Sequence, residues 1–139
     1  MRKTKLVIEN VFEGNVIGVV STLKDYKLAW SINQVFNIEL ALQPPIVMEF
    51  LKAPDLVITN FVFEDEFCAY RLLRNRGNDL NSGYLIPELV NFDYFILLTG
   101  EEEILPDQTV IDQLRNVNGI SFFQQIDVNR LRSKDNFIF

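Results

Sequence analysis

The sequence contains no histidine and only one cysteine among its 139 residues. Without histidine, the chain lacks the side chain that most often acts as a general base near neutral pH and most often binds metal ions. A single cysteine cannot form a disulfide within the chain, and one thiol with carboxylates is a poor ligand set for a transition metal. The sequence therefore predicts no metal site and no cofactor, and it lacks the usual parts of a catalytic centre.

Long apolar runs are also missing. The longest are short segments such as residues 16–20, whereas a membrane-spanning helix needs about 20 apolar residues. The first residues are basic, but Glu9 interrupts the apolar stretch that follows them, so no signal peptide is expected. Together with the lone cysteine, these features predict a cytoplasmic protein with no membrane partner.

Positive charge is scarce. Thirteen Lys and Arg residues face nineteen Asp and Glu residues, which gives a net charge of −6. An acidic chain repels the phosphate backbone of nucleic acids, and the sequence has no glycine-rich phosphate loop. Binding of nucleic acid is therefore disfavoured.

What the sequence does contain is a sizeable apolar fraction, 48%, with twelve phenylalanines. A chain of this length and composition predicts one domain, residues 1–139, with its own core. Its periodicity predicts the α+β class: a largely antiparallel sheet with two helices, at about 23–36 and 107–117, packed on it. The predicted strands are 5–9, 15–20, 39–42, 46–51, 56–63, 67–74, 92–98 and 120–128.

Several local features refine these predictions. Thr22 and Asp25 resemble a capping box that opens the first helix, and Trp30 lies on the apolar stripe of that helix, which predicts a core position. Pro44 and Pro45 should end one short strand before the next begins. Residues 56–74 form the clearest hairpin, in which Cys68 is predicted to be a buried structural thiol.

The stretch around residues 85–98 organises the chain. Pro87 suits the first position of a helical turn, Glu88 suits its positively polarised start, and the apolar run from Phe92 predicts a buried strand. Ile86-Pro87-Glu88 followed by Phe92-Asp93-Tyr94 resembles the signature of the IPExxxVDY family of Bacteroidota, with Phe92 in place of valine. Residues 25–30 and 97–100 are similar to the same family pattern. The resemblance implies membership of a family but no particular reaction.

Two alternatives remain open for the motif carboxylates. Glu88 and Asp93 could act as a general acid and base beside Tyr94 and Arg74, or they could hold backbone N–H groups at the turn and at the strand start. Arg74 and Arg76 share one face of a strand end, where they could contact an anion or pair with nearby carboxylates, namely Glu64, Asp65, Glu66 or Glu101.

The chain ends in three apolar residues, Phe137 to Phe139, which should be docked on the domain's own core or in a homodimer interface. The leading hypothesis is a non-catalytic interaction or scaffold protein with an unknown protein partner. The alternative is a small-ligand binder or enzyme that uses Glu88, Asp93, Tyr94 and Arg74. A third, weaker hypothesis is RNA association, which the resemblance suggests because genes of that family tend to lie near those for ribonuclease III and acyl carrier protein.

Overall fold

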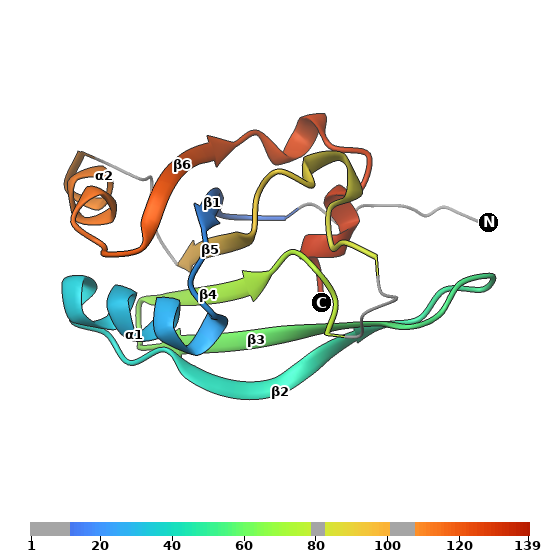
Figure 1. The fold of residues 1–139 in the computed structure, drawn as a ribbon, viewed down its shortest axis with the longest axis horizontal. Helices are drawn as coiled ribbons and strands as arrows, with labels where there is room; N and C mark the ends of the chain where they lie inside the picture. The colour runs from blue at the N-terminus through green and yellow to red at the C-terminus, as the bar shows by residue number, and fades with distance from the viewer. Residues whose placement is uncertain (1–11, 79–82, 101–107) are drawn as a thin grey trace.

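The computed structural model describes residues 12–78, 83–100 and 108–139 (Figure 1). Its elements are β1 (Asn15–Ser21), α1 (Asp25–Phe36), β2 (Ala41–Met48), β3 (Leu56–Glu64), β4 (Cys68–Arg74), the 3-10 turn η1 (Pro87–Leu89), β5 (Tyr94–Gly100), α2 (Gln108–Arg115), β6 (Ile120–Ile126) and the 3-10 turns η2 (Val128–Arg130) and η3 (Lys134–Phe137). The predicted strand at 5–9, the acidic turn at 101–103 and part of the loop at 76–83 lie outside the described residues.

The six strands of the described residues form one antiparallel sheet in the order β2-β3-β4-β5-β1-β6. With α1 and α2 packed beside it, this confirms the predicted α+β class. The hairpin of β3 and β4 is also confirmed. The sequence did not predict that β1 lies between β5 and β6, because strand order depends on contacts between distant residues.

Both faces of the sheet are covered. On one face, α1 and α2 pack on residues such as Tyr94, Ile96 and Leu98. On the other, the motif turn and the C-terminal segment pack on Phe95 and Leu97. In Figure 1, α1 and α2 lie towards the left of the view and the C-terminal turns lie towards the right. Because β5 is buried on both faces, its apolar residues run without alternation.

Strand β2 corrects one prediction. Pro44 and Pro45 do not separate two strands; they form an irregularity inside a single strand, where the pairing shifts between Gln43 and Ile46. The prolines are tolerated because β2 lies at the edge of the sheet, where a missing N–H breaks few ladder hydrogen bonds. The prediction that residues 46–51 form an edge strand is confirmed for residues 46–48.

Helix α1 differs from prediction in two respects. Its N-cap is Lys24, without a side-chain capping bond, so the predicted Thr22–Asp25 capping box is wrong; Asp25 instead accepts the N–H of Tyr26. Its buried face consists of Leu28, Ala29, Ser31 and Ile32. Trp30 is therefore on the outer side of the helix, and the core position predicted for it is wrong.

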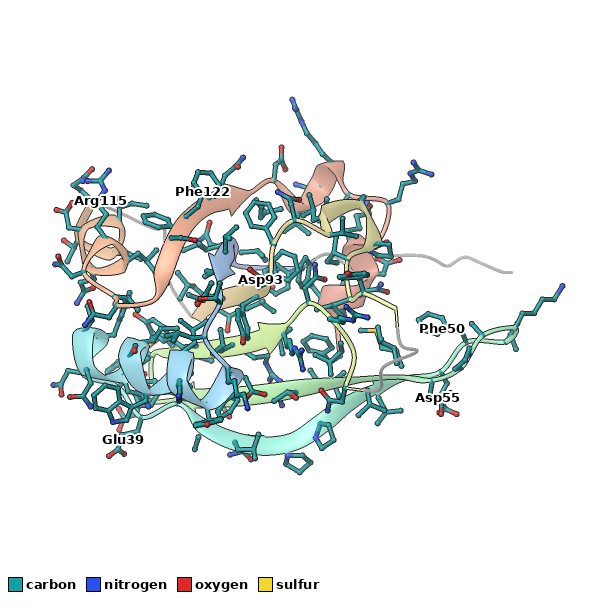
Figure 2. The ribbon with its side chains drawn as sticks, viewed as in Figure 1. Glu39, Phe50, Asp55, Asp93, Arg115 and Phe122 are labelled. Atoms are coloured by element: carbon teal, nitrogen blue, oxygen red, sulfur yellow. The ribbon has the colours of Figure 1, made fainter. Side chains whose placement is uncertain are left out.

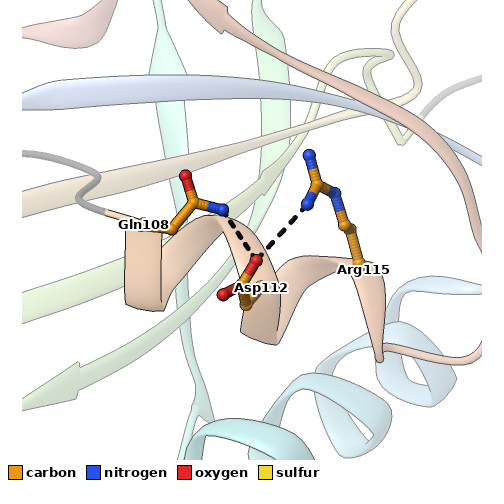
Figure 3. A network of polar contacts seen from close by, with 3 residues as sticks. All are labelled: Gln108, Asp112 and Arg115. Atoms are coloured by element: carbon orange, nitrogen blue, oxygen red, sulfur yellow. Dashed lines mark hydrogen bonds and ion pairs between the residues drawn. The ribbon is translucent and has the colours of Figure 1, made fainter.

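Helix α2 carries a small polar network on its exposed side. The Asp112 carboxylate accepts hydrogen bonds from the Gln108 amide at 2.8 Å and from the Arg115 guanidinium at 3.3 Å (Figure 3). Pairs spaced three and four residues apart share a helix face and stabilise it slightly. The opposite side buries Val110 and Leu114 against the sheet.

Candidate functional site

The motif forms a tight turn that packs against the sheet. Ile86 is fully buried, Pro87 occupies the first position of η1, and the turn closes with the N–H of Leu89 on the carbonyl of Ile86. Phe92 then bonds back to Leu89, which delivers the chain into β5. The predicted one-turn helix before a buried strand is therefore confirmed as a 3-10 turn.

Asn75 holds this turn in place, although the sequence reasoning assigned it no role. It is fully buried immediately after β4. Its side-chain N–H groups donate to the carbonyls of Leu89 and Phe92, both at 2.9 Å, and its oxygen accepts the N–H of Ile86 at 2.9 Å. Its backbone N–H also donates to the carbonyl of Asp93. A buried amide with every group paired fixes both position and direction of the segment it binds.

Glu88 reaches the C-terminal segment. One carboxylate oxygen accepts the backbone N–H of Arg132 at 2.7 Å and that of Ser133 at 3.1 Å. Partial burial acts to raise the pKa of Glu88, but hydrogen bonds from its own backbone, from Ser133 and from Arg132 outweigh it and lower the pKa below its ordinary value. Glu88 thus connects residues that are 44 and 45 positions apart in the sequence.

Phe92 is buried over β1. A Cβ atom added to Gly18 would lie 2.7 Å from the ring of Phe92, so the ring occupies the space above a glycine. The ring also stacks on Phe122 of β6, with centroids 6.3 Å apart (Phe122 is labelled in Figure 2). A large residue at this motif position therefore requires a residue without a side chain beneath it.

Asp93 and Tyr94 fix the segment between β1 and α1. The Asp93 carboxylate accepts the N–H of Ser21 at 2.9 Å, and the Tyr94 hydroxyl donates to the carbonyl of Leu23 at 2.6 Å. Burial raises the pKa of Tyr94 to about 12; Asp25 and Asp93 also raise it, whereas Arg74 opposes them. Tyr94 is therefore a neutral hydrogen-bond donor at neutral pH.

A cleft of about 740 Å³ lies beside these two residues. Arg74, Arg76, Asp93 and Tyr94 line it, together with residues 21–25, Tyr84, Val90 and Phe92. Glu88 is not among the lining residues, because its carboxylate is directed to the C-terminal segment. The structure thus brings together three residues of the proposed catalytic set and leaves out the fourth.

The predicted pairing of Arg74 and Arg76 is not observed among the described residues. Ion pairs in that part of the chain join only Arg115 to Asp112 and Arg130 to Asp127; Glu101, one of the predicted partners, lies outside it. The Arg76 guanidinium instead lies 5.8 Å from the centre of the Tyr84 ring.

Cys68 is partly exposed, so its predicted full burial is wrong. The thiol lies beside Asp65, whose carboxylate accepts the N–H groups of Phe67 and Cys68 at the hairpin turn. The pKa of Cys68 is raised, mainly because the thiol is partly desolvated and to a smaller extent because Asp65 lies beside it. A thiol that is harder to ionise is a poor nucleophile.

The C-terminal residues divide between core and surface. Phe137 is buried and meets the ring of Phe95 edge-on, at 5.3 Å between centroids. This confirms docking on the domain's own core for Phe137. Phe139 is exposed, and the Arg71 guanidinium lies 5.2 Å from the centre of its ring.

A second hollow lies on the outer side of α1. Trp30 is 64% exposed and Tyr26 is 55% exposed. With Leu23, Lys27, Ser31, Asn118 and Gly119 they line a groove of about 530 Å³, called the aromatic groove below. The sequence reasoning missed it, because the helical period shows that Tyr26 and Trp30 share a face but not that this face is uncovered.

The described residues contain no cluster of three or more side chains suited to metal binding. Within them, no helix has both the length and the apolar character needed to cross a bilayer. No family model matches the chain, and no curated protein matches it. The resemblance of residues 86–94 to the IPExxxVDY family therefore stays a hypothesis.

We expect Gly18→Ala to lower the free energy of unfolding by about 1 to 3 kcal/mol, because the new methyl group would overlap the Phe92 ring. Phe92→Val should also destabilise, through the lost ring contacts. The double variant should lose less unfolding free energy than the two single variants lose together, by about 1 kcal/mol or more, because valine leaves room for the methyl group. Urea denaturation of all four proteins measures this coupling; strictly additive effects would contradict the packing described for Phe92.

We expect Glu88→Gln to lower the stability by about 1 kcal/mol at pH 7, because a neutral amide accepts the two backbone N–H groups less strongly. The folded-state pKa of Glu88 is lowered, so its contribution is present above the unfolded-state pKa and is lost as the pH falls through the folded-state value. The difference in melting temperature between wild type and variant should therefore shrink on acidification towards pH 3. An unchanged difference between pH 7 and pH 3 would show that the carboxylate charge is not the cause.

Proposed function

We propose that this chain is a non-catalytic cytoplasmic interaction protein and that it binds a protein partner through the aromatic groove. One observation carries the proposal: the indole of Trp30 and the ring of Tyr26 are exposed on one side of a helix whose other side is packed. Tryptophan and tyrosine are enriched among the residues that dominate protein–protein binding energies. The cytoplasmic location rests on the single cysteine of the sequence.

The groove also suggests the chemistry of the partner. Lys27 is the one charged residue among those that line the groove, so the groove carries a positive charge in a chain whose net charge is −6. A matching partner segment would insert an apolar side chain between Tyr26 and Trp30 and place an acidic residue near Lys27. Catalysis is less well supported, because Glu88 is bonded to the C-terminal segment and does not line the cleft of Asp93, Tyr94 and Arg74.

Homodimerisation is part of the proposal, but we assign the interface to a different part of the chain from the C-terminal tail. Phe137 is committed to the core of its own chain, so the tail offers only its last residues for an interface. Strand β6 is a better candidate, because among the described residues it pairs only with β1 and its seven residues include neither proline nor charge. Such an edge is open to strand addition, whereas the prolines of β2 protect the opposite edge. Two copies joined through β6 would therefore close as a dimer rather than continue as a filament.

We expect Trp30→Ala to weaken binding of the partner by at least about tenfold, because truncating an interface tryptophan removes a dominant contact. Phe67→Ala is a matched control: Phe67 is an aromatic residue 68% exposed, at the hairpin turn outside the groove. Affinity capture from the native cytoplasm with the three baits, quantified by mass spectrometry, should identify a protein retained by wild type and Phe67→Ala and lost with Trp30→Ala.

The identified partner can then be tested directly. Trp30 is the only tryptophan, so its fluorescence should report a water-exposed indole in the free protein and shift to shorter wavelength when the partner binds. If no captured protein distinguishes Trp30→Ala from Phe67→Ala, the aromatic groove is not the binding surface.

Substitution at the sheet edge tests the dimer. Gln124 is exposed in the middle of β6, and Gln124→Lys should weaken self-association by at least about tenfold, since lysines on an edge strand oppose strand pairing. Gln124→Thr keeps the edge neutral and should leave self-association unchanged. Sedimentation equilibrium measures both, with circular dichroism to verify folding. A wild-type protein that stays monomeric at high micromolar concentration would contradict the dimer without affecting the proposal for the aromatic groove.

A further inference from the structure

The cleft beside Asp93 and Tyr94 carries a second inference, which is independent of the aromatic groove. Its volume, about 740 Å³, is within the range typical of sites for small molecules, about 300 to 1,000 Å³. Four separate segments form its walls: residues 21–25, the end of β4 with Arg76, Tyr84, and residues 90–94. Asp93, which is labelled in Figure 2, is an exposed residue of the last of these segments.

The carboxylates that line the cleft have hydrogen-bond partners, whereas its arginines have no carboxylate partner among the described residues. Its lining includes three cations, Lys24, Arg74 and Arg76, and two carboxylates, Asp25 and Asp93. Each carboxylate already accepts a backbone N–H, that of Tyr26 for Asp25 and that of Ser21 for Asp93. Among the described residues, neither arginine lies within ion-pair distance of a carboxylate. With three cations and two carboxylates, the lining carries a net charge of +1 in a chain whose net charge is −6.

The two arginines are also held by a rigid frame. Arg74 lies opposite Tyr94 in the register of β4 and β5, so both side chains leave the same face of the sheet. Arg76 is bridged to Tyr84 through the backbone and stacks near its ring. Asn75, between the two arginines, is fully buried and bonded to the motif turn. A fixed backbone on both sides lowers the entropy lost when the guanidinium groups close on a ligand.

From this arrangement we propose that the cleft binds a small molecule through a phosphate group, with Arg74 and Arg76 as the phosphate-binding residues. A guanidinium donates two parallel hydrogen bonds to an oxyanion, and two such groups with Lys24 can surround a tetrahedral anion on several sides, whereas a carboxylate is satisfied by one guanidinium. The rest of the molecule would lie on the apolar wall of Val90 and Phe92. The motif then has two roles: its turn builds the fold, and residues 92–94 form one wall of the site.

The experiment uses the full chain and inorganic phosphate as the probe. Phosphate is titrated to tens of millimolar, with chloride at matched ionic strength as the reference and acetate as the carboxylate comparison, and ¹H–¹⁵N correlation spectra are recorded. We expect saturable shifts for phosphate at the amides of residues 21–25, 74–76 and 92–94, and weaker shifts for acetate. Arg74→Gln and Arg76→Gln should each weaken phosphate binding by about tenfold.

Arg115→Gln is the matched control, because it removes the same charge from an exposed arginine of α2 that is paired with Asp112 (Figure 3). It should leave phosphate binding unchanged, and thermal melting verifies that all variants fold. The proposal is overturned by shifts no larger with phosphate than with chloride, by equal weakening in Arg115→Gln, or by acetate binding at least as tightly as phosphate. None of these outcomes bears on Trp30 or on partner binding.

Discussion

The structure depends on the side chain of Asn75. This buried amide reaches two carbonyls and one N–H of residues 86–92, and it thereby fixes the motif turn to the end of β4. An apolar residue at this position would leave several backbone groups buried without partners, at a cost of about 1 to 3 kcal/mol for each. The direction in which β5 enters the sheet, and therefore the positions of Asp93 and Tyr94, follows from these bonds.

From this anchor the motif ties together parts of the chain that are distant in sequence. Glu88 binds the backbone of residues 132 and 133, Asp93 binds Ser21, and Tyr94 binds the carbonyl of Leu23. Phe92 adds a packing contact across Gly18 of β1. Each motif side chain therefore connects β5 or its preceding turn to a different segment, and together they join the two covered faces of the sheet.

The same arrangement separates the surfaces available for function. The aromatic groove lies on the outer side of α1, and the cleft with Arg74 and Arg76 lies where α1 begins. Leu23 lines both, and its carbonyl is held by Tyr94. The interaction surface and the anion-binding cleft that we propose are therefore built on one well-fixed segment and can be altered independently through Trp30 and Arg74.

The sequence by itself determined the class of the fold, the hairpin of β3 and β4, and the turn that precedes β5. These features follow from local properties: alternation of apolar residues, the fixed φ of Pro87, and turn residues between two strands. It also offered backbone binding as one of two roles for the motif carboxylates, and Glu88 and Asp93 do accept backbone N–H groups.

Only the tertiary structure decided the strand order, the partners of Asn75 and Glu88, and the exposure of Trp30. The helical period places Tyr26 and Trp30 on one side of α1, but whether that side is covered depends on elements elsewhere in the chain. Likewise, Pro44 and Pro45 end a strand in the interior of a sheet yet are tolerated within β2, because β2 lies at the edge. Local sequence encodes the shape of each element, whereas its surroundings are set by contacts between residues far apart in the chain.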